Sequence, residues 1–131
     1  METLVSLLVV AILILTLGAV ITGSYHKRPG ATRRAGQLLR AILTAEQYDQ
    51  LIQQDYIDIP SPSYPERVYR VPRSCGHVQV REKGRLTMGL CLQPFEWVPD
   101  ADIVVIHKLM IEADEETYLQ KANHLAPFSY P

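Results

Sequence analysis

The sequence predicts an α+β protein, in which an N-terminal transmembrane helix precedes a small domain with short helices, a three-stranded antiparallel meander and a long C-terminal helix. Three observations predict this class: an uncharged apolar run at residues 3–22, helical periodicity on both sides of the middle of the chain, and alternation of apolar and polar residues within that middle. The predicted units are a transmembrane anchor at 1–24, a basic juxtamembrane segment and helix at 25–43, a cytoplasmic domain at 44–125 and a flexible tail at 126–131.

The anchor is predicted from length and composition. Twenty helical residues span roughly 30 Å, the thickness of the hydrocarbon core of a bilayer. The first three residues contain no Lys or Arg, and no clear cleavage site follows the run, which disfavours a secretory signal peptide. The small pairs Gly18/Thr22 and Ala19/Gly23 predict that two anchors pack as a homodimer.

The charges beside the run predict the orientation in the cell membrane. No base precedes the run, and five follow it: Lys27, Arg28, Arg33, Arg34 and Arg40. The positive-inside rule then places the N-terminus outside and the C-terminal domain in the cytoplasm. We expect Lys27, Arg28, Arg33 and Arg34 to contact anionic lipid headgroups.

The charge of the whole chain is −1, which argues against a general polyanion binder, but its distribution is uneven. Residues 25–40 carry five bases and no acid, and residues 41–66 carry five acids and no base. Residues 67–85 then carry six bases against one acid, and residues 86–131 carry seven acids against two bases. The alternation favours pairing between segments of opposite sign within the domain.

Two short helices are expected before the sheet. Apolar residues recur at helical spacing from Ala35 to Leu43, and a second helix follows from Ala45 to about Asp55. The sequence Thr44-Ala45-Glu46-Gln47 is typical of a capping box at the start of the second helix. The stretch 59–65 has three prolines, which predict an extended connector.

Three strands are predicted: one at about 67–71 from β-branched and aromatic residues, and two at 77–81 and 86–92 from alternating apolar and polar residues. A three-residue loop at 82–84 would pair Val80 with Leu86 and would place Gly84 at a left-handed position. The apolar face of this meander consists of Val78, Val80, Leu86, Met88 and Leu90.

The C-terminal helix is predicted from about Ala101 to Asn123, with Asp100 as its cap and a possible break at 113–114. The β-branched stretch 103–111 also fits a buried strand, so both alternatives stay open. The face predicted to pack on the meander contains Ile106, Met110 and Tyr118. The acids Glu112, Asp114, Glu115 and Glu116 are expected on the solvated face.

Cysteine and histidine residues are the first candidates for chemistry. Cys75, His77, Cys91 and His107 have the side chains of a zinc site or of a Cys/His nucleophile, but their spacing matches neither pattern. In a cytoplasmic domain the two thiols would stay reduced. No cofactor, metal or catalytic residue is therefore predicted.

A basic sheet face is the second candidate. Its predicted members are Arg67, Tyr69, Arg70, Arg81, Lys83 and Arg85. Arginine and lysine contact phosphates and tyrosine stacks on bases, so this face would bind nucleic acid or a protein partner.

Several short segments resemble a small bacterial domain family with no known activity. They are Tyr69-Arg70-Val71-Pro72, Leu90-Cys91-Leu92-Gln93-Pro94, Pro99-Asp100-Ala101-Asp102 and the stretch from His107 to Glu116. The resemblance covers about residues 44–125 and implies a self-contained domain, with no catalytic residues to transfer.

The function predicted from the sequence is a membrane-tethered, non-enzymatic interaction or regulatory module with a protein partner. One alternative is a nucleic-acid-binding domain held at the membrane through the basic sheet face. Another is a small enzyme or metal-binding domain that uses its Cys and His groups.

Overall fold

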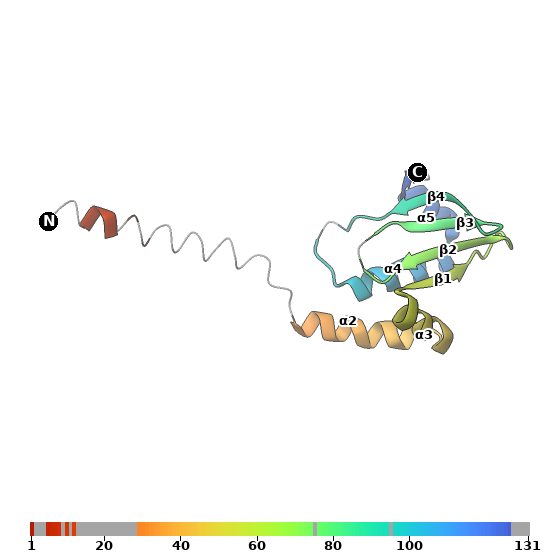
Figure 1. Ribbon diagram of the computed structural model, residues 1–131, viewed down its shortest axis with the longest axis horizontal. Coiled ribbons are helices and arrows are strands. Elements are labelled where there is room, and N and C mark those ends of the chain that lie inside the picture. Colours follow the sequence, from red (N-terminus) through yellow and green to blue (C-terminus); the bar gives the residue numbers. More distant parts are fainter. Residues whose placement is uncertain are drawn as a thin grey trace.

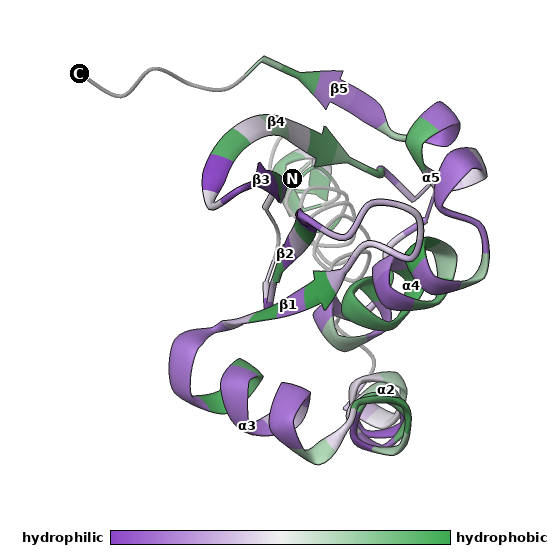
Figure 2. Ribbon diagram, turned by 90° about the vertical axis from the view of Figure 1, so that its right-hand side faces the viewer, coloured by the Kyte–Doolittle hydropathy of each residue, from purple (hydrophilic) through white to green (hydrophobic). Residues whose placement is uncertain are grey.

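The computed structural model describes residues 1, 5–8, 10, 12, 29–74, 76–94 and 96–126. The elements in order are α2 (Pro29–Ile42), α3 (Ala45–Gln54), β1 (Tyr56–Pro60), β2 (Arg67–Pro72), β3 (Val78–Glu82), β4 (Arg85–Cys91), α4 (Asp100–Ala113), α5 (Glu115–Lys121) and β5 (Asn123–Leu125) (Figure 1). The strands form one antiparallel sheet in the order β1-β2-β3-β4-β5, and α4 and α5 lie against one of its faces (Figure 2). The predicted three-stranded meander is therefore wrong.

The predicted single-pass membrane protein, with its N-terminus outside and its domain in the cytoplasm, is also not supported. In the part of the chain that the structure describes, no helix is long and apolar enough to cross a bilayer. The longest of these helices, α2 and α4, have 14 residues each, which corresponds to about 21 Å. Most of the run 3–22, with the small pairs of the expected homodimer, lies outside the described residues.

The two helices before the sheet are confirmed, with a longer first helix than expected. Helix α2 begins at Pro29 rather than near Ala35, and proline suits the first turn because its missing N–H would have no helical partner there. At the start of α3 the capping box is complete. The Gln47 N–H donates to Thr44 Oγ1 at 3.1 Å, and the Thr44 N–H donates to Gln47 Oε1 at 3.3 Å.

Strands β1 and β5 are the edges of the sheet, and the sequence reading missed both. In β1, Ile57 and Ile59 are fully buried and alternate with Tyr56 and Asp58. Pro60 ends this strand, at a sheet edge where a missing N–H is tolerated. The predicted connector therefore contains the end of a strand. Strand β5 has only three residues, too few to show an alternating pattern.

The β3–β4 hairpin has a two-residue turn rather than the predicted three-residue loop. Lys83 and Gly84 both have positive φ, 50° and 78°, which is typical of a type I′ turn. A bulge at Thr87 then shifts the register, so that Val80 pairs with Met88 rather than Leu86. Leu86 consequently leaves the apolar face and is 37% exposed.

The long C-terminal helix is two helices. Asp114 adopts an extended backbone with φ −157° and ψ 85°, which ends α4. Its carboxylate then accepts the N–H of Thr117 at 3.0 Å and caps α5. The chain continues into β5 rather than remaining helical to Asn123, and Asp100 is the first residue of α4 rather than its cap.

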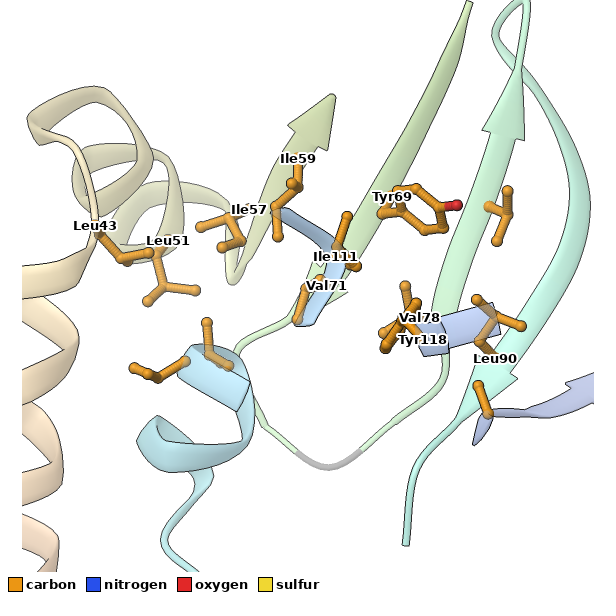
Figure 3. Packing of buried hydrophobic residues seen from close by; sticks show 14 of the residues in the cluster. Leu43, Leu51, Ile57, Ile59, Tyr69, Val71, Val78, Leu90, Ile111 and Tyr118 are labelled. Atoms are coloured by element: carbon orange, nitrogen blue, oxygen red, sulfur yellow. The ribbon is translucent and has the colours of Figure 1, made fainter. Parts of the chain in front are cut away.

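One core lies between the sheet and the helices (Figure 3). Its largest fully buried side chains are Tyr69 in β2 and Tyr118 in α5, whose rings meet edge to face with centroids 6.0 Å apart. Val78, Val80 and Leu90 from the predicted apolar face are fully buried as expected. Ile106, predicted to pack on the sheet, is 40% exposed.

Candidate functional site

A buried carboxylate organises one end of the sheet. Glu115, the first residue of α5, is 5% exposed and accepts the hydroxyl of Ser61 at 2.7 Å and the backbone N–H of Ser63 at 3.1 Å. The hydroxyl of Tyr69 also donates to it, and the Arg67 guanidinium lies 3.6 Å away. The carboxylate thereby joins α5 to β2 and to the loop between β1 and β2.

The hydrogen bonds decide the ionisation of this cluster. Burial alone would raise the pKa of the Glu115 carboxyl, but the bonds from Tyr69, Ser61 and Ser63 hold that pKa below its usual value. Burial and the neighbouring carboxylate raise the pKa of the Tyr69 hydroxyl, so it stays protonated and donates. With its oxygens occupied by several donors, Glu115 is suited to hold structure rather than to accept a proton from a substrate.

Arg67 connects this cluster to the surface. Its Nε and Nη2 donate to Glu82 Oε1 at 2.9 and 2.7 Å, and its guanidinium lies 4.1 Å from the centre of the Tyr64 ring. The Tyr64 backbone N–H donates to Ser61 Oγ at 2.9 Å. Both members of this cation–π pair are therefore held in place before any ligand binds.

A groove of about 650 Å³ opens beside the pair. Its walls are the β1–β2 loop and the β3–β4 hairpin, which lie at the same end of the sheet (Figure 1). The lining residues are Tyr64, Pro65, Glu66, Arg67, Glu82, Lys83, Arg85 and Thr87. We name this site the hairpin groove.

The hairpin groove has a mixed charge with an excess of one base. Lys83 lies 3.3 Å from Glu66, and Arg67 lies 2.7 Å from Glu82. Among the described residues no acid forms a salt bridge with Arg85, which is exposed. Tyr64 is 53% exposed at the same groove. A ligand would therefore meet one aromatic ring and one available cation.

The structure separates the six residues predicted for a nucleic-acid or partner face. Arg67, Lys83 and Arg85 line the hairpin groove, whereas Tyr69 is fully buried. The other two, Arg70 and Arg81, are on the sheet face away from the core.

These two arginines have different partners. Arg70 makes two hydrogen bonds to Asp58, at 2.8 and 2.9 Å, and stacks on the Tyr56 ring at 3.9 Å. Arg81 donates to the Gly84 carbonyl at 3.0 Å. Acids from neighbouring segments thus neutralise much of the base-rich stretch, as the alternating charge blocks predict.

Two of the four residues predicted to contact lipid lie in the part of the chain that the structure describes. Lys27 and Arg28 lie outside the described residues, and Arg33 and Arg34 are exposed on α2. The predicted lipid contact depends on a membrane location that the described helices do not support.

The cysteine and histidine candidates do not form a recognisable site. His107 is buried in α4, where its Nδ1 lies 2.9 Å from the Tyr118 hydroxyl, and burial lowers its pKa to about 4. Cys91 is half-buried in β4, and the position of Cys75 is outside the described residues. Within the described ranges no three His, Cys, Asp or Glu side chains could hold a metal ion together.

Sequence reasoning missed Glu115, which it placed with three other acids on a solvated face. The spacing Asp114-x-x-Thr117 is the signal in the sequence that could have indicated this. A cap at Asp114 starts a new helix, so Glu115 no longer continues the exposed face of the preceding helix. Ser61 and Ser63 lie in the stretch that the sequence predicts as an extended connector.

No protein-family model, no curated protein and no solved structure matches this chain.

Proposed function

We propose that this protein is a non-enzymatic interaction module that binds an acidic peptide segment of a protein partner in the hairpin groove. The observation that carries the proposal is the Tyr64–Arg67 pair, held on the groove wall by hydrogen bonds to Ser61 and Glu82. Tyrosine and arginine are the side chains that most often dominate protein interfaces. Because they are already ordered, less conformational entropy is lost on binding.

The charges favour an acidic segment. Glu66 and Glu82 each already lie beside a base, whereas Arg85 lines the groove without a salt bridge from the described residues. Arginine pairs with a carboxylate through two parallel hydrogen bonds, so Arg85 suits an aspartate or glutamate of the partner.

The groups whose pKa values burial shifts most lie away from the hairpin groove, which supports binding rather than catalysis there. His107 and Tyr118 are buried, and they bond to each other rather than lining the hairpin groove. Glu115 is occupied by its donors. The groove instead carries three cations, two carboxylates that each lie beside one of these cations, and an aromatic ring, a set of groups that can attract and orient a ligand.

Single-stranded nucleic acid is the second candidate, because Arg67, Lys83 and Arg85 gather beside the exposed ring of Tyr64. Phosphates would meet the cations and a base would stack on the ring. Such binding weakens steeply as salt rises.

The test uses the full chain, a display library of random peptides and mixed-sequence single-stranded oligonucleotides. We expect enrichment of acidic peptides, and Arg85→Glu should weaken the best one by about tenfold or more. Arg73→Glu is the matched control, because Arg73 is exposed outside the groove and pairs with Asp55. Equal binding by both variants, or selection of oligonucleotides alone, would overturn the peptide proposal.

A further inference from the structure

The outer side of α4 is apolar where a solvated face is expected. Ile106 and Leu109 are 40% and 46% exposed, and Ala113 lies on the same side of the helix one turn after Leu109. Beside them is an almost wholly apolar notch of about 250 Å³ between α4 and α5. Its lining residues are Leu109, Met110, Ala113, Asp114 and Thr117.

Helix α2, which packs beside α4, carries a matching projection. Ala35 and Leu39 face the core, whereas Leu38 is 47% exposed. Gly36 lines a separate cavity toward α3, and Leu38 is rotated about 200° from it around the helix axis. Leu38 therefore lies on the flank of α2 that faces away from that cavity.

The charges around these two features are opposite. Helix α2 contains three arginines and no acid, and Arg34 lies one turn before Leu38. Asp114 lines the notch, and Glu116 is exposed two residues later. One chain thus carries both an apolar projection with a basic flank and an apolar notch with an acidic rim.

We propose that two copies of this chain associate about a two-fold axis, with Leu38 of each protomer in the α4–α5 notch of the other. Two-fold interfaces are self-complementary, so they require both halves of the contact on each chain. Arg34 of one protomer then faces the acidic rim that contains Asp114 of its partner. The association uses the helices, and no residue that lines the notch also lines the hairpin groove.

The first test is sedimentation velocity of the full chain over a range of concentrations. We expect a monomer–dimer equilibrium, which Leu38→Asp and Leu109→Asp each weaken by about tenfold or more, since an unpaired carboxylate would enter an apolar contact. Ile52→Asp in α3 is the matched control, because Ile52 is 48% exposed, close to the 47% of Leu38. Circular dichroism checks that each variant is folded.

The second test is cross-linking, which does not depend on a disruptive variant. With Cys75 and Cys91 replaced by serine, chains carrying Leu38→Cys are mixed with chains carrying Ala113→Cys and oxidised. We expect mixed disulfide dimers, and Ile52→Cys in place of Leu38→Cys should give none. A monomer at all concentrations, or equal loss of dimer in the Leu38 and Ile52 variants, would overturn the proposal.

Discussion

The hydroxyl of Tyr69 in β2 donates a hydrogen bond to the carboxylate of Glu115, the first residue of α5. The two residues are 46 positions apart, and both are almost completely buried. The bond fixes α5 against the sheet, and the same carboxylate orders the loop that carries Tyr64. Core stability and the shape of the hairpin groove therefore depend on one side chain.

Replacement of Glu115 by Gln should destabilise the fold by about 1–3 kcal/mol at neutral pH, because buried donors lose a charged acceptor. The folded-state pKa of Glu115 is lowered, so its contribution is present above the unfolded pKa of about 4.3 and is lost as pH falls through the lower folded value. Urea unfolding across acidic pH measures this. Glu116→Gln, on the exposed side of α5, is the control. A constant difference between wild type and Glu115→Gln down to strong acid would contradict the assigned ionisation.

His107 should make stability fall between pH 6.5 and about 4. Burial lowers the pKa of His107 from 6.5 in the unfolded chain to about 4 in the folded protein. As the pH falls through this range, the unfolded chain takes up a proton while the folded protein does not, so the free energy of unfolding decreases. The loss across the window is about 3 kcal/mol. Urea unfolding measures the effect: between pH 6.5 and about 4, the free energy of unfolding should fall with pH in wild type and should lack this slope in His107→Gln. If His124→Gln removed the slope instead, the assignment to His107 would be wrong.

The two central positions of the β3–β4 turn should differ in how substitution affects stability. Gly84→Ala should cost about 1 kcal/mol, since φ of +78° disfavours a side chain. Lys83→Asn should be neutral or stabilising, because asparagine suits the first position of a type I′ turn. Thermal unfolding of both variants checks this. Destabilisation by Lys83→Asn that matches Gly84→Ala would indicate a different turn.

Thr44→Ala should destabilise the domain by about 1 kcal/mol, because α3 loses the side-chain oxygen that accepts the Gln47 N–H. Thr44→Ser keeps that oxygen and should remain close to wild type. Urea unfolding of the two variants gives the difference directly. Equal stability of Thr44→Ala and Thr44→Ser would show that the cap contributes nothing measurable.

Local patterns predicted those parts of the fold that depend on a few neighbouring residues. The capping box at Thr44, the strand containing Val78 and Val80, and the turn at Asp114 as one alternative could be read from spacing. The β3–β4 register could not be read from spacing. The bulge at Thr87 adds one residue to β4, and the alternation of apolar residues does not show where such a residue is inserted. Strand β5 was hidden by its length of three residues, and β1 was hidden by the prolines at its end and in the loop that follows it.

The candidate site was predicted only in part. The charge of Arg67, Lys83 and Arg85 predicts a binding face, and the tertiary structure brings these residues together with Tyr64. Charge alone could not show that Arg70 is paired with Asp58 or that Tyr69 is buried. The membrane prediction depended on one apolar run and has no support from the helices that the structure describes.

The sequence by itself determined helix capping, the alternation of buried residues in β3, and the pairing of acidic with basic segments. These follow from interactions within a few residues or from the distribution of charge along the chain. Only the tertiary structure decided that Glu115 is buried, that β1 and β5 complete the sheet, and that the groove forms between two loops. Each of these depends on groups far apart in the chain, whose contacts form only when the core excludes water and the buried polar groups must find partners.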